Sequence, residues 1–180
     1  YSLGARLALA LAQQSPAAVR ALILISVNPG LRLAAERAAR TASDEELALF
    51  LERHGTAAFL AQHWERLPLF ASQQKLPSEL LATQQTQRMR HDPFGLANCL
   101  RVLGLGVMPS YWDLLPQLAE QVPITLLTGT LDEKFHGLAA EICTVSSRIA
   151  WLSAPDVGHN LLLEAPELVG RLVQHTLLTP

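Results

Sequence analysis

The stretch Tyr1-Ser2-Leu3-Gly4 decides the fold of this chain. It matches the second half of the G-x-S-x-G nucleophile elbow, in which a serine stands on a sharp strand-to-helix turn that exposes its hydroxyl. Residues 7–12 are good helix formers, and residues 21–25 form a continuous apolar run that predicts a buried strand. A turn, a helix and a strand therefore follow one another in the order of a parallel α/β unit.

The opening glycine of that motif would lie before Tyr1, as would the strand that leads into the turn. We therefore expect the chain to be N-terminally truncated. The missing part should hold the first core strands and the loop that supplies the second oxyanion donor.

Composition limits the possible functions. The chain has 180 residues, of which 49% are hydrophobic, enough for one sizeable core. Its formal net charge of −2 gives no reason to expect nucleic acid or an anionic membrane surface as a partner, and no apolar run is long enough to span a bilayer. Cys99 and Cys143 lack metal-ligand spacing, which predicts free thiols, no metal and a cytoplasmic location.

The pattern divides the chain into three parts. We expect an α/β core at 1–29, which holds the nucleophile elbow, a helical cap at 30–116, and the α/β core again at 117–180. Strand signals are absent from the middle part, where amphipathic stretches predict helices at 34–42, 44–54, 56–65, 77–90 and 95–103. In the last part we expect strands at 123–128 and 147–152 and helices at 135–141 and 166–178.

Two further residues complete a catalytic pattern. Asp132 follows the strand expected at 123–128, and His159 follows the strand expected at 147–152. Ligands of open α/β sheets bind at the carboxyl ends of the strands, where both residues would lie. The chain order Ser2, Asp132, His159 is that of the α/β-hydrolases. We therefore predict an α/β-hydrolase fold, a mostly parallel sheet with an inserted helical cap.

The chemistry explains why these three residue types occur together. A serine hydroxyl needs an imidazole to take its proton, and a carboxylate must hold that imidazole in the correct tautomer. The backbone N–H of Leu3 would be one oxyanion donor. Taken singly, Asp132 is also a good helix cap, and His159 could be an ordinary loop histidine. Asp156 is a rival for the acid, although it lies very close to His159 in sequence.

Several motifs narrow the family. They are Tyr1 to Arg6, Asn28-Pro29-Gly30-Leu31, the arginine-rich stretch 36–40 ending in Ser43-Asp44, Trp64 with Pro68 to Ser72, Gly95 to Asn98, Gly129 to Phe135 and Gly158-His159-Asn160. Across nearly its whole length the chain resembles the 2-succinyl-6-hydroxy-2,4-cyclohexadiene-1-carboxylate synthases, the menaquinone-pathway lyases of the α/β-hydrolase superfamily. It departs from them at Ala5, where a second glycine is frequent, and at Glu65, where some have tyrosine.

The resemblance implies a cofactor-free elimination of pyruvate from an enolpyruvyl-succinyl-hydroxycyclohexene carboxylate in menaquinone or phylloquinone synthesis. The triad would act as a base. The partner would be a small polyanionic carboxylate, which guanidinium groups bind bidentately. The substrate-binding residues implied are Arg6, Arg40, Trp64 and Arg88, with Arg90 as the alternative to Arg88. No oligomeric state is predicted.

Two other functions fit the same fold. A serine carboxylesterase or thioesterase would use the same triad through an acyl-enzyme, but a neutral ester needs no cluster of arginines. A catalytically inactive hydrolase-fold protein could serve as a binding module, although such a protein has no reason to keep Ser2, Asp132 and His159.

Overall fold

The computed structural model describes residues 1–178, and its contacts divide the chain into two compact units. The first unit joins Tyr1–Pro29 to Tyr111–Pro180, and the second unit is Gly30–Ser110. None of the helices within the described residues is long and apolar enough to cross a membrane.

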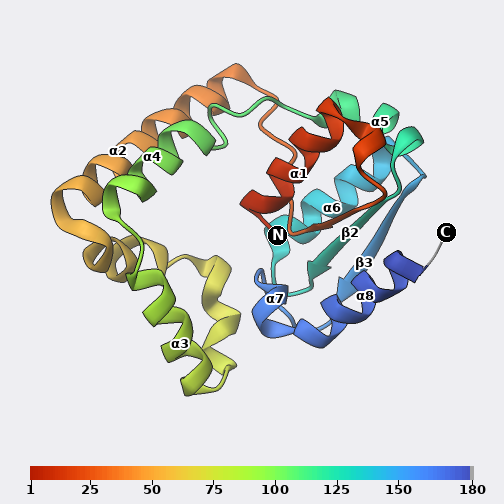
Figure 1. The fold of residues 1–180 in the computed structure, drawn as a ribbon. Coiled ribbons are helices and arrows are strands. Elements are labelled where there is room, and N and C mark those ends of the chain that lie inside the picture. Colours follow the sequence, from red (N-terminus) through yellow and green to blue (C-terminus); the bar gives the residue numbers. More distant parts are fainter. Residues whose placement is uncertain (179–180) are drawn as a thin grey trace. The chain divides into compact units, whose positions relative to one another are not determined.

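The first unit is built on a parallel sheet with the strand order β1-β2-β3 (Figure 1). The strands are β1 (Leu22–Ile25), β2 (Ile124–Gly129) and β3 (Ile149–Ala154). Leu22 lies opposite Ile124, and Ile124 lies opposite Ile149, so the three strands begin level with one another. Because parallel strands in this register also end at one edge, the residues that follow them gather there. The predicted parallel sheet is confirmed.

Helices pack on the sheet through its alternating apolar side chains. They are α1 (Leu3–Gln14), α5 (Leu115–Gln121), α6 (Glu133–Val145), α7 (Leu161–Glu164) and α8 (Pro166–Leu178), with 3-10 turns at Pro16–Ala18 and Trp112–Leu114. α6 packs on β2 and β3. Ile25, Leu127 and Ala154 of the strands form one core cluster with Leu161 and Leu172 of α7 and α8. This cluster lies beneath the edge at which the strands end.

The second unit is helical. It consists of α2 (Ala34–Phe59), a π-helical turn at Leu60–Trp64, a 3-10 segment at Pro68–Lys75, α3 (Ser78–Met89) and α4 (Pro93–Leu103). α2 and α4 pack together around Ala48, Leu51 and Ala97, all of which are fully buried. α4 begins where Asp92 accepts a hydrogen bond from the Gly95 N–H at 2.6 Å, a regular N-cap.

The structure differs from the expected helices at Ser43. The sequence predicts separate helices at 34–42 and 44–54, but α2 runs through this point without a break. Asp44 does not cap a new helix, because its carboxylate accepts a hydrogen bond from Nε of Arg40, one turn earlier, at 2.8 Å. The helical backbone is interrupted instead at Gly55, whose φ of 79° suits glycine.

The boundary between the units also differs from the expected one. Residues 111–116 fall in the first unit, whereas the sequence places them in the helical insertion. The Tyr111 N–H donates to the Pro29 carbonyl oxygen at 2.7 Å, which closes the insertion at its base. Trp112 and Leu115 are buried in the first unit. The burial of these apolar side chains explains why residues 111–116 are part of the first unit.

Candidate active site

Ser2 occupies a strained turn at the start of α1. Its φ of 48° and ψ of −112° lie in a region that residues other than glycine rarely adopt. Its backbone N–H donates to the Ile25 carbonyl oxygen at the end of β1, at 2.9 Å. Ala5, one turn along α1, is buried, and its small side chain lets the helix pack closely here. Strain of this kind is concentrated at functional sites, and it presents the serine at the edge where the strands end.

Ser2, His159 and Asp132 form one chain of hydrogen bonds. Nδ1 of His159 lies 2.7 Å from Oδ2 of Asp132, and Nε2 of His159 lies 3.2 Å from Oγ of Ser2. An ionised carboxylate can only accept, so the proton of the first bond belongs to Nδ1. Nε2 of the neutral ring is then unprotonated and can accept the serine proton. The structure thus brings together three residues that are separated by up to 157 positions.

Asp132 is fixed by the loop that follows β2. It is the N-cap of α6, where its Oδ1 accepts from the Phe135 N–H at 3.4 Å while its Oδ2 faces His159. The helix cap and the partner of the histidine, which the sequence left as alternatives, are therefore the same carboxylate. Asp132 is 4% exposed, so its interaction with the imidazole is little weakened by solvent.

Two aromatic rings contact the imidazole of His159. Its ring centroid lies 4.5 Å from that of Phe135 and 5.2 Å from that of Tyr1, and the residue is 1% exposed. Its carbonyl oxygen accepts from Oγ of Ser26, a buried residue directly after β1, at 3.1 Å. No motif in the sequence points to Ser26. The available signal was a polar residue at the end of a buried strand.

Leu3 and Arg6 lie in the first turn of the helix that Ser2 begins. Leu3 is the first residue of α1, and the N–H groups of a first turn have no acceptor within the helix. The Arg6 N–H donates to the Ser2 carbonyl oxygen at 3.2 Å, which places the arginine one turn beyond the serine. The oxyanion role of Leu3 and the substrate-binding role of Arg6 stay predictions.

The other proposed binding residues lie in the second unit. Nε of Arg40 is bound to Asp44, and its side chain is 36% exposed. The guanidinium of Arg88 lies 5.3 Å from the ring centroid of Phe70, which also contacts Trp64 at 5.4 Å. Arg88 is half-buried while Arg90 is exposed. Trp64 ends the π-helical turn, a feature that is frequent at functional sites.

Asp156 does not contact His159 through any interaction seen among the described residues. It is exposed, with a positive φ of 59°, and its N–H donates to Oγ1 of Thr130. The bond to His159 comes from Asp132 instead. Within residues 1–178, no cluster of three or more histidine, cysteine or acidic side chains could hold a metal.

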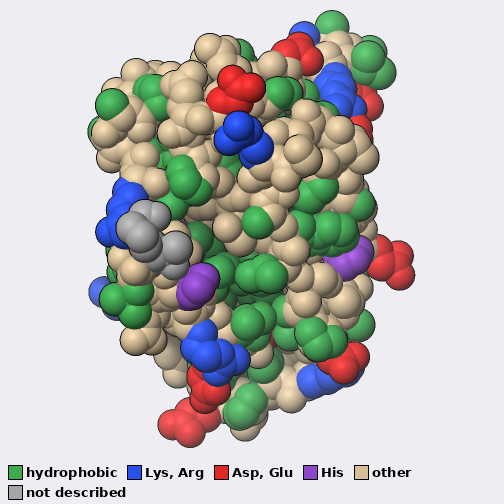
Figure 2. Space-filling model, turned by 90° about the vertical axis from the view of Figure 1, so that its right-hand side faces the viewer, with side chains coloured by type: hydrophobic (Ala, Val, Ile, Leu, Met, Phe, Trp, Pro, Cys, Tyr) green, Lys and Arg blue, Asp and Glu red, His purple; other side chains and the backbone are tan. Residues whose placement is uncertain are grey.

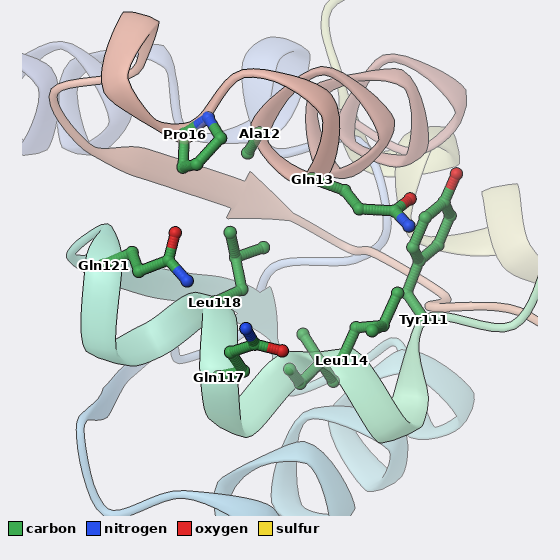
Figure 3. Close-up of a pocket in the computed structure, with 9 residues that line it drawn as sticks. Ala12, Gln13, Pro16, Tyr111, Leu114, Gln117, Leu118 and Gln121 are labelled. Atoms are coloured by element: carbon green, nitrogen blue, oxygen red, sulfur yellow. The ribbon is translucent and has the colours of Figure 1, made fainter.

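A small hollow of about 90 Å³ lies elsewhere on the first unit (Figure 3). α1 and the turn after it border it through Ala12, Gln13 and Pro16, and the opposite side is formed by Tyr111, Leu114, Gln117, Leu118 and Gln121. Burial raises the pKa of the Tyr111 phenol, so this hydroxyl stays neutral. At 1.5 Å per residue, Gln13 lies about 16 Å along the helix from Ser2. The hollow is therefore separate from the candidate site.

Figure 2 shows the distribution of charged side chains on one face of the molecule. Acidic and basic side chains are interspersed there with hydrophobic ones.

The chain is similar to known proteins over almost its entire length. It is 40% identical, over 98% of its length, to a protein of Bacillus subtilis (strain 168) provisionally named 2-succinyl-6-hydroxy-2,4-cyclohexadiene-1-carboxylate synthase. It is 32% identical, over 100% of its length, to the synthase of that name from Serratia proteamaculans (strain 568). A solved structure of MenH from S. aureus superimposes with a TM-score of 0.91 at 32% identity over 98% of this chain. No family model matches.

The chain spans only part of each of these proteins. It covers 64% of the Bacillus protein, 67% of the Serratia protein and 65% of the solved chain. Within that span the identity and the superposition extend over both units. This chain therefore belongs to the family of 2-succinyl-6-hydroxy-2,4-cyclohexadiene-1-carboxylate synthases, in the α/β-hydrolase superfamily.

Proposed function

We propose that the complete protein is a lyase that eliminates pyruvate from an enolpyruvyl-succinyl-hydroxycyclohexene carboxylate. The product would be 2-succinyl-6-hydroxy-2,4-cyclohexadiene-1-carboxylate, an intermediate of menaquinone or phylloquinone synthesis. The observation that carries this proposal is the hydrogen-bonded chain of Ser2, His159 and Asp132 in a member of this family. The reaction needs a base that removes a ring proton, and the hydrogen-bonded Ser2, His159 and Asp132 would act as that base.

The proposed mechanism begins with proton removal. Oγ of Ser2 takes a ring proton as its own proton passes to Nε2 of His159, and Asp132 stabilises the imidazolium that forms. The most acidic ring proton is one beside a carbonyl group, so negative charge develops on that carbonyl oxygen. The N–H of Leu3 would donate to such an oxygen. The electrons then break the C–O bond to the enolpyruvyl group, which leaves as the enolate of pyruvate. The enolate takes up one proton to become pyruvate and the imidazolium of His159 gives up one, so the triad returns to its starting state.

We also propose residues that bind the substrate carboxylates. Arg6 is the first, because it lies one turn from Ser2. Arg40 and Arg88 of the second unit, which would serve as the cap, are the others. Each is oriented by a neighbour, Arg40 by Asp44 and Arg88 by Phe70. Guanidinium groups match carboxylates in geometry and remain charged when partly buried. Trp64, in contact with Phe70, would supply an apolar wall.

We propose the cytoplasm as the compartment. Both cysteines are free, and such thiols persist in reducing compartments. Burial raises the pKa of the Cys143 thiol, which keeps it protonated and poorly reactive.

Two assays on the complete protein test the lyase against the esterase alternative. One follows pyruvate release from the enolpyruvyl-cyclohexene substrate, and the other follows hydrolysis of a short-chain aryl ester. Efficient pyruvate release with feeble ester cleavage is the expected result. Efficient ester cleavage without pyruvate release would replace the lyase by a hydrolase.

A further inference from the structure

The backbone on either side of His159 is held by one side chain. Oε2 of Glu164 accepts a hydrogen bond from the Gly158 N–H at 2.8 Å, and Oε1 of the same carboxylate accepts one from the Asn160 N–H at 3.2 Å. The carboxylate therefore bridges the residues before and after the histidine. Hydrogen bonds to an ionised acceptor are stronger than those between neutral groups.

Glu164 is itself fixed in place. It ends the short helix α7, and its own N–H donates to the Asn160 carbonyl oxygen at 2.9 Å. Leu161, at the start of α7, is fully buried in the core cluster beneath the sheet edge. The Ala165 N–H donates to the Leu161 carbonyl oxygen, which leads the chain directly into α8. The carboxylate thus connects the histidine loop to the packed core.

Two other hydrogen-bond partners of His159 bind different parts of the residue. Asp132 holds the ring through Nδ1, and Ser26 holds the carbonyl oxygen of the histidine. Only Glu164, among the hydrogen-bond partners seen in residues 1–178, holds the N–H groups on both sides of His159. The Asn160 N–H belongs to the peptide group that directly follows the α-carbon of His159, and the Gly158 N–H belongs to the peptide group one residue before the histidine. Together they fix the loop from which the histidine side chain leaves the backbone. The separation of 3.2 Å between Nε2 and Oγ of Ser2 depends on the position of that loop.

We propose that Glu164 is a positioning residue that aims His159 at Ser2. It touches no reacting atom and acts through the loop backbone. The consequence for pyruvate release rests on the proposed function, whereas the effect on the reactivity of Ser2 does not. A displacement of about 1 Å at a catalytic group can lower the rate by about a hundredfold.

The test compares E164A and E164Q with E167Q in the complete protein. E164A removes both acceptors, and E164Q keeps one acceptor oxygen and the length of the side chain. Glu167 is the matched control, because it lies three residues further on, and its side chain is 90% exposed beside Arg171. For each folded variant, kcat and KM for pyruvate release are measured. The second-order rate of Ser2 labelling by a fluorophosphonate probe is measured beside them.

E164A is expected to lower kcat by about ten- to a hundredfold with KM nearly unchanged, and to slow fluorophosphonate labelling in parallel. E164Q is expected to lie between E164A and the wild type, and E167Q to match the wild type. Rates are calculated per correctly folded molecule, so a change in stability alone would leave them at the wild-type value. If E164A does not fold, E164Q carries the test.

Wild-type labelling rates in folded E164A, or in folded E164Q where E164A does not fold, would overturn the proposal. The two hypotheses also fail separately. Slow labelling in E164A together with a wild type that releases no pyruvate would support the positioning role and refute the lyase. Pyruvate release by the wild type, together with normal kcat and normal labelling in E164A, would support the lyase and refute the positioning role of Glu164.

Discussion

The α-carbon of Gly129 lies against the main-chain carbonyl oxygen of Val157. A β-carbon on Gly129 would fall well inside van der Waals distance of that oxygen and of the Gly158 carbonyl oxygen. The same Val157 oxygen accepts a hydrogen bond from the Leu131 N–H at 2.9 Å. The end of β2 and the histidine loop therefore meet backbone to backbone. This contact places Asp132 within reach of His159.

Replacing Gly129 by alanine should push the two loops apart. We expect G129A to lower the melting temperature by several degrees and to reduce pyruvate release at least tenfold, since overpacking against a backbone cannot be relieved by a rotamer change. G137A is the matched control. Gly137 lies in α6 with no atom within 4 Å of an added β-carbon, and alanine is the better helix former there. Equal activity in G129A and G137A would contradict this account of the site.

Asp132 should be essential as an acceptor for His159. In D132N the side chain keeps its size and the oxygen that caps α6, but its NH₂ group would face Nδ1 and favour the wrong tautomer. We expect kcat to fall by roughly 10³–10⁴ with little change in melting temperature. D156N is the control, because Asp156 is exposed and asparagine tolerates its positive φ. If D156N lost activity while D132N kept it, Asp156 rather than Asp132 would be the acid that holds His159.

Arg6 should contribute to substrate binding rather than to proton transfer. The loss of one charged hydrogen bond is worth about 1.5–3 kcal/mol, so R6A should raise KM for the carboxylate substrate by about ten- to a hundredfold. R6K should be intermediate, because an ammonium group keeps the charge but not the bidentate geometry. The rate of Ser2 labelling by an uncharged fluorophosphonate is the control and should stay near the wild-type value. An unchanged KM in R6A would remove Arg6 from the binding site.

The second unit should lose stability in acid. Arg101 on α4 binds both Glu45 and Glu52 on α2, and its hydrogen bonds lower the pKa of both carboxyls below their ordinary value of 4.5. A carboxyl with a depressed pKa in the folded state stabilises the fold above its unfolded pKa, and this contribution is lost as pH falls through the folded value.

The melting temperature should therefore fall when the pH is lowered from about 5 to about 3, and this dependence should be weaker in R101M. R101M should also melt at a lower temperature at neutral pH, since it leaves the two glutamates unpaired side by side. R171M, which removes a well-exposed partner of Glu167, is the control and should behave as the wild type. Identical pH profiles for R101M and the wild type would contradict the role of this cluster.

The sequence predicts the sheet and the three-residue chain because both depend on local patterns. The apolar runs at 21–25 and 123–128 become β1 and β2 within one residue at each end, and Ser2, Asp132 and His159 each lie just beyond a predicted strand or at the start of a helix. In a parallel sheet these positions meet at one edge whatever lies between them.

The helices of the second unit are less well predicted, since their ends depend on contacts between distant residues. The helix through Ser43 carries only the local Arg40–Asp44 pair, whereas α2 and α4 are joined by Arg101, which is 49 residues from Glu52. Ser26 and Glu164 were missed because their role is to hydrogen-bond the backbone around His159. Ser26 is 133 residues from His159, and Glu164 binds loop residues that precede it, so neither follows a helix-cap pattern of the kind that Asp132 shows.

In the proposed reaction, Ser2, activated by His159, removes a proton from a carboxylate-bearing ring, and pyruvate is released. The most direct measurement is kcat/KM for pyruvate release by the complete protein and by its S2A variant. We expect the wild type to release pyruvate efficiently, and we expect kcat/KM to fall by at least about 10³-fold in S2A with an unchanged melting temperature. Normal pyruvate release by folded S2A would contradict this role of Ser2.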